Sequence, residues 1–251
     1  SNPQGITYSD EVVDRFAGLK PKAKDFRIFW DNAYAVHHFT EKPDHLKNIL
    51  EACKNARNPD MVFIFTSTSK ITFPGAGVAM VAASENNINF MKNQLMYQTI
   101  GPNKINQLRH IRFLKSIENI DGHMKKQAKI IKPKFDTVFN ILDREIGGKD
   151  IAWWSKPNGG YFLSLDVLDG CAKSVVKMAG DAGVKLTCAG ATYPYGKDPR
   201  DRNIRIAPSY PALLELEKAI EILCVCIKII SIRKLLSLRA LPHPAIFWPL
   251  L

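Results

Sequence analysis

Two short apolar runs that flank a helical stretch constrain the fold of this chain more than any other feature. Residues 26–30 and 61–65 are rich in aromatic and β-branched side chains, as buried strands are. The segment between them, roughly 44–58, repeats apolar residues at helical spacing. Strand, helix, strand is the pattern of two parallel strands joined by a helix. We therefore predict an α/β protein, with a third strand over residues 77–83.

A short polar run follows each of the first two predicted strands. Asp31 and Tyr34 come after the first strand, and Ser67 and Lys70 come after the second. Open α/β sheets bind ligands beyond the carboxyl ends of their strands. Pyridoxal phosphate needs these residue types: an amine for its aldehyde, an acid for its ring nitrogen, and hydroxyls for its phenolic oxygen and phosphate. Taken singly, Asp31 is more typical of a helix cap or a turn, and Ser67 and Ser69 are typical of a helix cap, so the prediction depends on the combination.

Three further motifs join these two runs. In chain order the five motifs are Ser1-Asn2-Pro3-Gln4-Gly5, Asp31-Asn32-Ala33-Tyr34, Ser67-Thr68-Ser69-Lys70, Pro157-Asn158-Gly159-Gly160-Tyr161-Phe162 and Asn203-Ile204-Arg205-Ile206. From Asn2 to about Leu223, their order and spacing resemble those of the class I/II aminotransferases, which are fold-type I pyridoxal phosphate enzymes. The sequence from Lys70 to Gly77 is most similar to that of a bacterial aspartate/alanine-aminotransferase-like branch, which is sometimes grouped with MocR-type proteins.

The resemblance implies a role for each candidate site residue. Lys70 would be the catalytic Schiff-base lysine, and Arg205 would bind the substrate α-carboxylate, which suits its planar fork of donors. The implied cofactor is pyridoxal 5′-phosphate, and no metal is expected. The other implied cofactor contacts are the ring nitrogen for Asp31, the phenolic oxygen for Tyr34 and Asn2, and the phosphate for Ser67.

The chain departs from the family pattern in two places. Most relatives carry a phosphate-binding arginine eight residues after the lysine, where this chain has Val78. In addition, the chain opens inside the Asn-Pro motif, before which relatives carry a glycine-rich phosphate turn and an aromatic residue that stacks on the cofactor. We therefore expect this chain to be the C-terminal part of a longer aminotransferase.

The expected fold is a partial pyridoxal-phosphate-dependent transferase fold. Residues 1–120 would form part of the large domain, a mostly parallel sheet with helices on both faces. Residues 121–147 would form an interdomain helix that Pro133 kinks or interrupts. Residues 148–236 would form a small α+β domain, and residues 237–251 an atypical tail. The further elements expected are helices over 84–99, 102–116, 170–182 and 212–229, and strands over 161–165, 184–187 and 203–207.

Composition narrows the possible partners and compartment. The net charge of +11 does not favour nucleic-acid binding, because the basic residues are spread along helices opposite apolar faces. No apolar run is long enough for a membrane span. The five cysteines lack metal spacing, and Cys53, Cys224 and Cys226 fall in apolar helical patterns as reduced core thiols would, which predicts a cytoplasmic protein.

The predicted function is the transfer of an amino group between an amino acid of the aspartate, glutamate or alanine type and a 2-oxo acid. The full-length form is expected to be a homodimer, as its relatives are. Two alternatives stay open: an amino-acid-sensing domain of a transcriptional regulator, and an inactive fragment. A lyase or decarboxylase that uses the same lysine is a further possibility, since the sequence does not define which α-carbon bond is broken.

Overall fold

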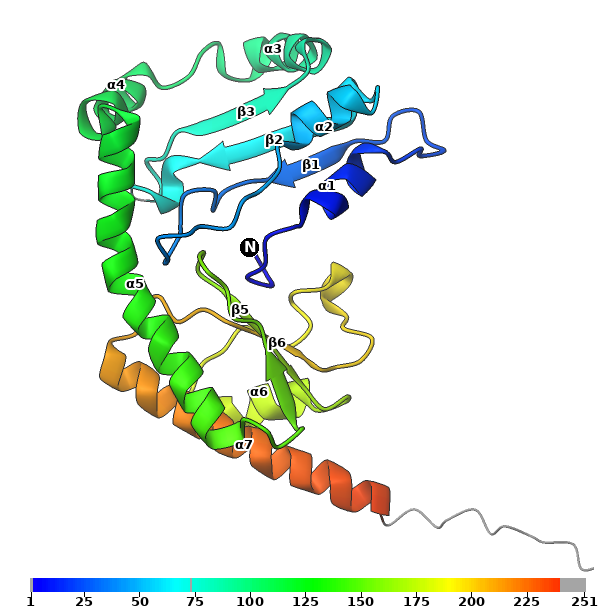
Figure 1. The fold of residues 1–251 in the computed structure, drawn as a ribbon, viewed down its shortest axis with the longest axis vertical. Helices are drawn as coiled ribbons and strands as arrows, with labels where there is room; N and C mark the ends of the chain where they lie inside the picture. The colour runs from blue at the N-terminus through cyan, green and yellow to red at the C-terminus, as the bar shows by residue number, and fades with distance from the viewer. Residues whose placement is uncertain (1, 73, 240–251) are drawn as a thin grey trace, which may run out of the picture. The chain divides into compact units, whose positions relative to one another are not determined.

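The computed structural model describes residues 2–72 and 74–239, which fall into two compact units. We call residues 7–129 with 158–160 the N-terminal unit, and residues 2–6, 130–157 and 161–239 the C-terminal unit. Each unit is described by itself (Figure 1). Most of the predicted tail, from residue 240 on, lies outside the described residues.

The N-terminal unit is built around a three-stranded sheet of order β1-β2-β3 (Figure 1). Its elements are α1 (Asp10–Ala17), β1 (Ile28–Asp31), α2 (Ile49–Asn55), the 3₁₀ turn η1 (Pro59–Met61), β2 (Val62–Ser67), the 3₁₀ turn η2 (Thr68–Lys70), β3 (Ala79–Ala83), α3 (Glu85–Thr99), α4 (Lys104–Leu114) and the first part of α5 (Ile117–Ile146). β1 and β2 are parallel, so the predicted α/β class is confirmed. β3 runs antiparallel to β2, because residues 68–78 are too few for the helical crossover that a parallel pair requires.

Helices α1 and α2 cover one face of this sheet. Val13 and Cys53, from the two helices, are fully buried and pack with Trp30 and Val62 from the strands. On the opposite face, Phe29 is 73% exposed. The predicted helical cover on both faces is therefore not observed over β1 among the described residues.

The C-terminal unit holds a second sheet, which is antiparallel with the order β4-β5-β6. Its elements are the second part of α5, β4 (Ala152–Trp154), β5 (Leu163–Val167), α6 (Ala172–Asp181), the turn η3 (Pro194–Gly196), β6 (Asn203–Ile206) and α7 (Leu213–Arg239). Buried residues recur at helical spacing on α5 and α7, with Phe135, Val138 and Leu142 on α5 and Leu223 and Ile227 on α7. These two faces, together with α6 and β5, form an α+β core of the predicted kind.

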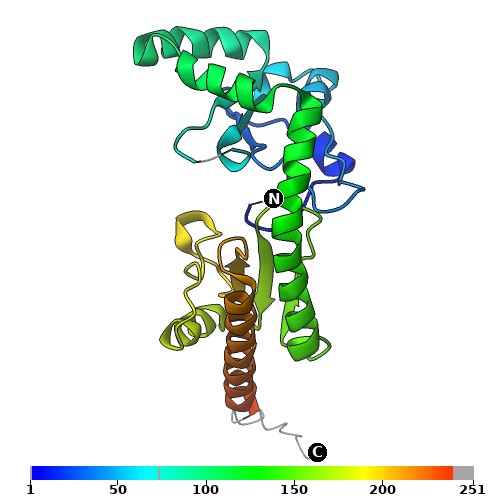
Figure 2. The ribbon, with the colours of Figure 1, turned by 90° about the vertical axis from the view of Figure 1, so that its left-hand side faces the viewer.

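Some predicted elements differ from those observed. α5 runs through Pro133 without interruption (Figure 2). Residues 184–187 form no strand, and α7 extends ten residues beyond its predicted end at 229, to Arg239. The predicted core thiols Cys53, Cys224 and Cys226 are buried and free, as expected. In the described part of the chain, no helix is long and apolar enough to cross a membrane.

Candidate active site

Lys70 lies in a tight turn directly after β2. The turn η2 continues the strand, and the Ser67 hydroxyl caps it by accepting a hydrogen bond from the Ser69 amide at 3.4 Å. We call residues 67–78 the lysine loop; position 73 within it is not described. The Lys70 side chain is exposed at the carboxyl end of the sheet, where ligands of α/β folds bind.

The segment after β1 lies alongside the lysine loop. Asp31 pairs with Phe65 in the parallel register, and the Asn32 amide donates to the Phe65 carbonyl at 2.8 Å. The Asp31 carboxylate accepts the Ala33 amide at 3.0 Å, which orients this exposed side chain. Because neighbouring parallel strands end at one edge of the sheet, the structure brings Asp31 and Lys70 to the same edge, as the sequence predicted.

His37 connects these two segments. Its Nε2 lies 3.1 Å from the Lys70 carbonyl oxygen, which can only accept, so Nε2 carries the hydrogen. Its ring also contacts the ring of Tyr34 edge-on, with centroids 5.4 Å apart. His37 is 4% exposed, and burial lowers its pKa. The neutral ring therefore holds the Tyr34 segment to the backbone of Lys70. Among the described residues, no group of three or more His, Cys, Asp or Glu side chains is placed to hold a metal ion.

The lysine loop is further held by side chains from helices α4 and α5. His110 contacts the hydroxyls of Thr68 and Thr72 at 2.9 and 3.1 Å. From α5, His123 and Gln127 both donate to the carbonyl of Ile71, the residue after Lys70. Motif matching did not identify these residues, because they lie 40 to 57 positions after Lys70 in segments without a motif. The sequence carried one sign of such a role, which is that the polar residues at positions 106 and 110 share a face of helix α4.

Asn2 and Arg205 belong to the C-terminal unit, where they bind each other. Arg205 Nη1 donates to the Asn2 side-chain oxygen at 2.9 Å, although 203 positions separate the two residues. The Arg205 guanidinium also stacks over the Phe162 ring at 4.6 Å, and its Nη2 lies 3.5 Å from the Thr187 hydroxyl. Arg205 Nε is buried without a hydrogen-bond partner in the described structure. A guanidinium has five N–H donors, so the contacts with Asn2 and Thr187 leave further N–H groups of Nη1 and Nη2 for an anion.

The turn that carries Asn2 needs its glycine. Gly5 is buried with a φ of +69°, and a Cβ there would lie 2.4 Å from the Phe162 carbonyl oxygen. Only glycine combines that backbone conformation with such a close approach. This turn and the strand that begins after Phe162 are thus fitted to each other, which links two of the five sequence motifs.

The residues of the N-terminal unit fit the chemistry of pyridoxal phosphate, with one exception. Asp31 offers an acceptor for a ring N–H, Lys70 an amine, and Tyr34 and Ser67 hydroxyl donors. The exception is the phosphate, because Lys70 is the only cation in the lysine loop. At the position of the missing arginine, the Val78 amide donates to the Thr68 hydroxyl at 2.8 Å, and the Val78 carbonyl accepts the Thr68 amide at 3.0 Å.

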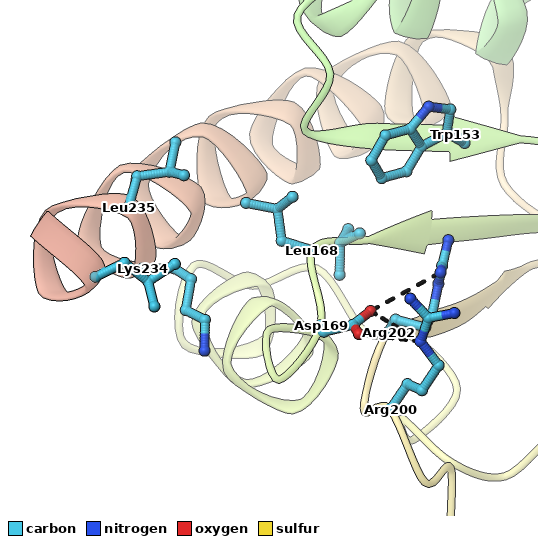
Figure 3. A pocket seen from close by; sticks show the side chains of 9 residues that line it. Trp153, Leu168, Asp169, Arg200, Arg202, Lys234 and Leu235 are labelled. Atoms are coloured by element: carbon cyan, nitrogen blue, oxygen red, sulfur yellow. Dashed lines mark hydrogen bonds and ion pairs between the residues drawn. The ribbon is translucent and has the colours of Figure 1, made fainter. Parts of the chain in front are cut away.

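A cavity of about 610 Å³ lies elsewhere, in the C-terminal unit (Figure 3). Arg200 and Arg202 line one side of it, and Asp169 approaches them at 3.0 and 3.8 Å. Trp153 and Leu235 contribute apolar surface. None of the predicted site residues lines this cavity, so it is not part of the candidate active site.

Comparisons with known proteins show that the chain is similar to aminotransferases. A family model described as aspartate amino-transferase matches residues 1–239. Over 237 residues the chain is 45% identical to a Mycolicibacterium smegmatis protein named as an aminotransferase, covering 94% of the chain and 55% of that protein. Over 227 residues it is 42% identical to an aspartate aminotransferase of Corynebacterium glutamicum, covering 90% of the chain and 52% of the relative.

The fold is also similar to that of a solved aminotransferase structure. The crystal structure of an aspartate transaminase from Corynebacterium glutamicum matches with a TM-score of 0.91 and 40% identity, covering 93% of this chain and 55% of that one. The chain thus spans about half the length of the curated relatives it matches.

Proposed function

The chain belongs to the aspartate aminotransferase family, and from this membership we propose that it carries the catalytic lysine of a pyridoxal-phosphate-dependent transaminase. The observation that supports this most strongly is the place of Lys70. It lies in a turn at the end of β2, beside Asp31 at the end of the parallel strand β1. This puts an amine and a carboxylate at one sheet edge, where the cofactor aldehyde and ring nitrogen need them.

The residues of the N-terminal unit would bind the cofactor and move the proton. When bound, pyridoxal 5′-phosphate supplies an aldehyde carbon and a protonated ring that withdraws electrons from the substrate α-carbon. Lys70 Nζ would hold the cofactor aldehyde and, as a free amine, would take the proton from the substrate α-carbon. Asp31 would accept the hydrogen bond of the ring N–H and keep the ring nitrogen protonated. Tyr34 would donate to the phenolic oxygen and Ser67 to the phosphate.

The residues of the C-terminal unit would orient the substrate. Arg205 binds the α-carboxylate through two parallel hydrogen bonds, which defines direction as well as affinity. Its hydrogen bond to Asn2 and its stacking on Phe162 hold the guanidinium plane in place before substrate arrives. Because Asn2 uses its oxygen for Arg205, its amide N–H₂ stays available to donate to the phenolic oxygen.

The proposed substrates are an amino acid of the aspartate, glutamate or alanine type and a 2-oxo acid. Five free cysteines support the expected cytoplasmic location, where thiols stay reduced. A homodimer of the full-length form is part of the same proposal.

A product assay tests this function. The chain is incubated with pyridoxal phosphate, 2-oxoglutarate and L-aspartate, L-glutamate or L-alanine in turn, and new keto and amino acids are measured by mass spectrometry. We expect Lys70→Ala to reduce the rate by about a hundredfold or more, the usual effect of losing a proton-transfer group. Asp31→Asn should also remove most of the activity, although it keeps the oxygen that accepts the Ala33 amide.

The matched control is Lys54→Ala, which removes an exposed lysine from α2 and should leave the rate unchanged. Equal rates in the parent and in Lys70→Ala would contradict the proposal. A sensing domain would show amino-acid-dependent cofactor spectra without product, and an inactive fragment would show neither.

A further inference from the structure

A chain of buried hydrogen bonds closes the lysine loop at its two ends. The Thr68 amide donates to the Val78 carbonyl at 3.0 Å, and the Thr68 hydroxyl accepts the Val78 amide at 2.8 Å. Thr68 is 6% exposed, so its own atoms in these bonds are shielded from water. Thr68 and Val78 are ten positions apart, with Lys70 between them. The conformation of the lysine turn therefore depends on the Thr68 hydroxyl.

His110 of α4 continues this chain, and its neighbours define where its protons lie. Its Nδ1 is 2.9 Å from the carbonyl oxygen of Asn106, which can only accept, so Nδ1 carries a hydrogen. With the ring hydrogen on Nδ1, Nε2 is the acceptor. The Thr68 hydroxyl lies 2.9 Å away and donates its hydrogen to Nε2, while the same oxygen accepts the Val78 amide through a lone pair. The bonds run in one direction, from Val78 through Thr68 to His110, and such chains strengthen one another.

Asn106 extends the contact of α4 to the far end of the loop. Its amide nitrogen donates to the carbonyls of Ala76 and Gly77 at 2.8 and 3.1 Å. Asn106 and His110 are four residues apart on one helix and thus share a face. That face holds the backbone or hydroxyls of the loop on both sides of Lys70.

We propose that His110 is a positioning residue, which sets the direction in which the lysine loop presents the Lys70 amine. The proposal rests on the proposed function of Lys70. The Lys70 side chain begins at the backbone of this turn, so the conformation of the turn sets the direction in which the side chain leaves it. A backbone held by buried hydrogen bonds delivers a reactive group in a defined geometry. His110 acts through Thr68 and touches no reacting atom.

The competing explanation is that His110 only fills space in the unit, since it is 7% exposed. Two substitutions separate the explanations. His110→Phe keeps an aromatic ring of similar volume but leaves the Thr68 hydroxyl without its acceptor. His110→Gln places a side-chain oxygen about as far along the side chain as Nε2 and restores an acceptor.

The experiment measures the loop and the lysine separately in the whole chain. Hydrogen exchange followed by mass spectrometry reports on residues 68–78, which include the Val78 amide. Borohydride trapping with pyridoxal phosphate, mapped by peptide, gives the rate at which Lys70 is labelled relative to Lys54. In His110→Phe we expect exchange in the loop to be about tenfold faster and Lys70 labelling about tenfold slower, as for one buried hydrogen bond left unmade. His110→Gln should recover most of both.

A second pair of variants covers the case in which His110→Phe does not fold. Thr68→Val removes the hydroxyl in an isosteric side chain, and Thr68→Ser keeps it. Thr68→Val should change both readouts in the same direction as His110→Phe and at least as strongly, because it also removes the acceptor of the Val78 amide, and Thr68→Ser should resemble the parent. Thr99→Val, which alters an exposed hydroxyl on α3, is the control and should change neither readout.

The outcomes distinguish this proposal from the proposed function. A lower melting temperature in His110→Phe with unchanged loop exchange and unchanged Lys70 labelling overturns the positioning role. Even labelling of all lysines in the parent overturns the function of Lys70. In that case the hydrogen-exchange data still test the role of His110 in the loop. Protection of the loop amides that is lost in His110→Phe and regained in His110→Gln supports positioning. Protection that is the same in both variants and the parent overturns it.

Discussion

At the scale of single residues, the contact between Gly77 and Ser69 shows how little room the lysine loop has. A Cβ on Gly77 would lie 2.5 Å from the Ser69 hydroxyl and 3.0 Å from its amide nitrogen. We expect Gly77→Ala to lower the free energy of unfolding by about 1–3 kcal/mol, the usual cost of overpacking, as measured by urea denaturation.

The control for this prediction is Gly122→Ala. Gly122 lies within α5, and apart from its chain neighbours and the nearby backbone of that helix, no described atom comes within 4 Å of the position that an added methyl group would take. Alanine there should therefore stabilise the chain by about 0.5–1 kcal/mol. If Gly77→Ala unfolds at the same urea concentration as the parent, the close packing described for the loop is wrong.

Among single residues, the candidate site residues were predictable from the sequence, but the residues that hold them in place were not. Asp31 and Lys70 were predictable, because polar groups at the ends of neighbouring parallel strands must share an edge. The hydrogen bond between Asn2 and Arg205 and the contact of His110 with Thr68 were not predicted. Both depend on how distant segments pack, and residue spacing carries no information about such contacts.

At the scale of elements, an ion pair joins α5 to α7 within the C-terminal unit. Lys228 Nζ lies 2.7 Å from a carboxylate oxygen of Glu145, and Arg144 approaches the same group at 2.9 Å. The hydrogen bond from Lys228, followed by that from Arg144, lowers the pKa of Glu145 to about 2. A carboxyl group with a lowered folded-state pKa stabilises the fold above its unfolded pKa of about 4.5, and this stabilisation is lost as the pH falls toward 2.

We therefore expect Glu145→Gln to lower the melting temperature at pH 7, and this difference to shrink between about pH 4.5 and about pH 2. Thermal unfolding at several pH values gives the measurement. Glu217→Gln, on an exposed site of α7 with no ion pair in the described structure, should show no such pH dependence. A difference between Glu145→Gln and the parent that stays constant across that whole range would contradict the role of this pair.

From the sequence, it was easier to predict that a helix or strand is present than to predict where it begins and ends. The helix expected over 44–58 is observed only over Ile49–Asn55, because the Asn48 side chain caps it by accepting the amides of Leu50 and Glu51. α7 continues past its predicted end, since the chain has no proline or glycine between that point and Pro242. The direction of β3 was not predicted, because the residue pattern of a strand does not define whether it runs parallel or antiparallel to its neighbour.

At the scale of the whole molecule, the candidate site residues are divided between the two units. Asp31, Tyr34, Ser67 and Lys70 belong to the N-terminal unit, and Asn2 and Arg205 to the C-terminal unit. Among the proposed roles, Lys70 and Asp31 of the first group serve the cofactor, and Arg205 of the second group serves the substrate carboxylate. The two groups thus allow separate tests, since attachment of the cofactor aldehyde depends first on the N-terminal unit.

The most direct test of the central claim is to reduce the chain with borohydride after incubation with pyridoxal phosphate and to map the modified peptides by mass spectrometry. Our account predicts a pyridoxyl adduct concentrated on Lys70, with little on the other lysines, and a strong decrease of that adduct in Asp31→Asn. Label that is absent, or scattered evenly over the lysines of the chain, would contradict the claim that Lys70 and Asp31 form an organised cofactor site in this chain.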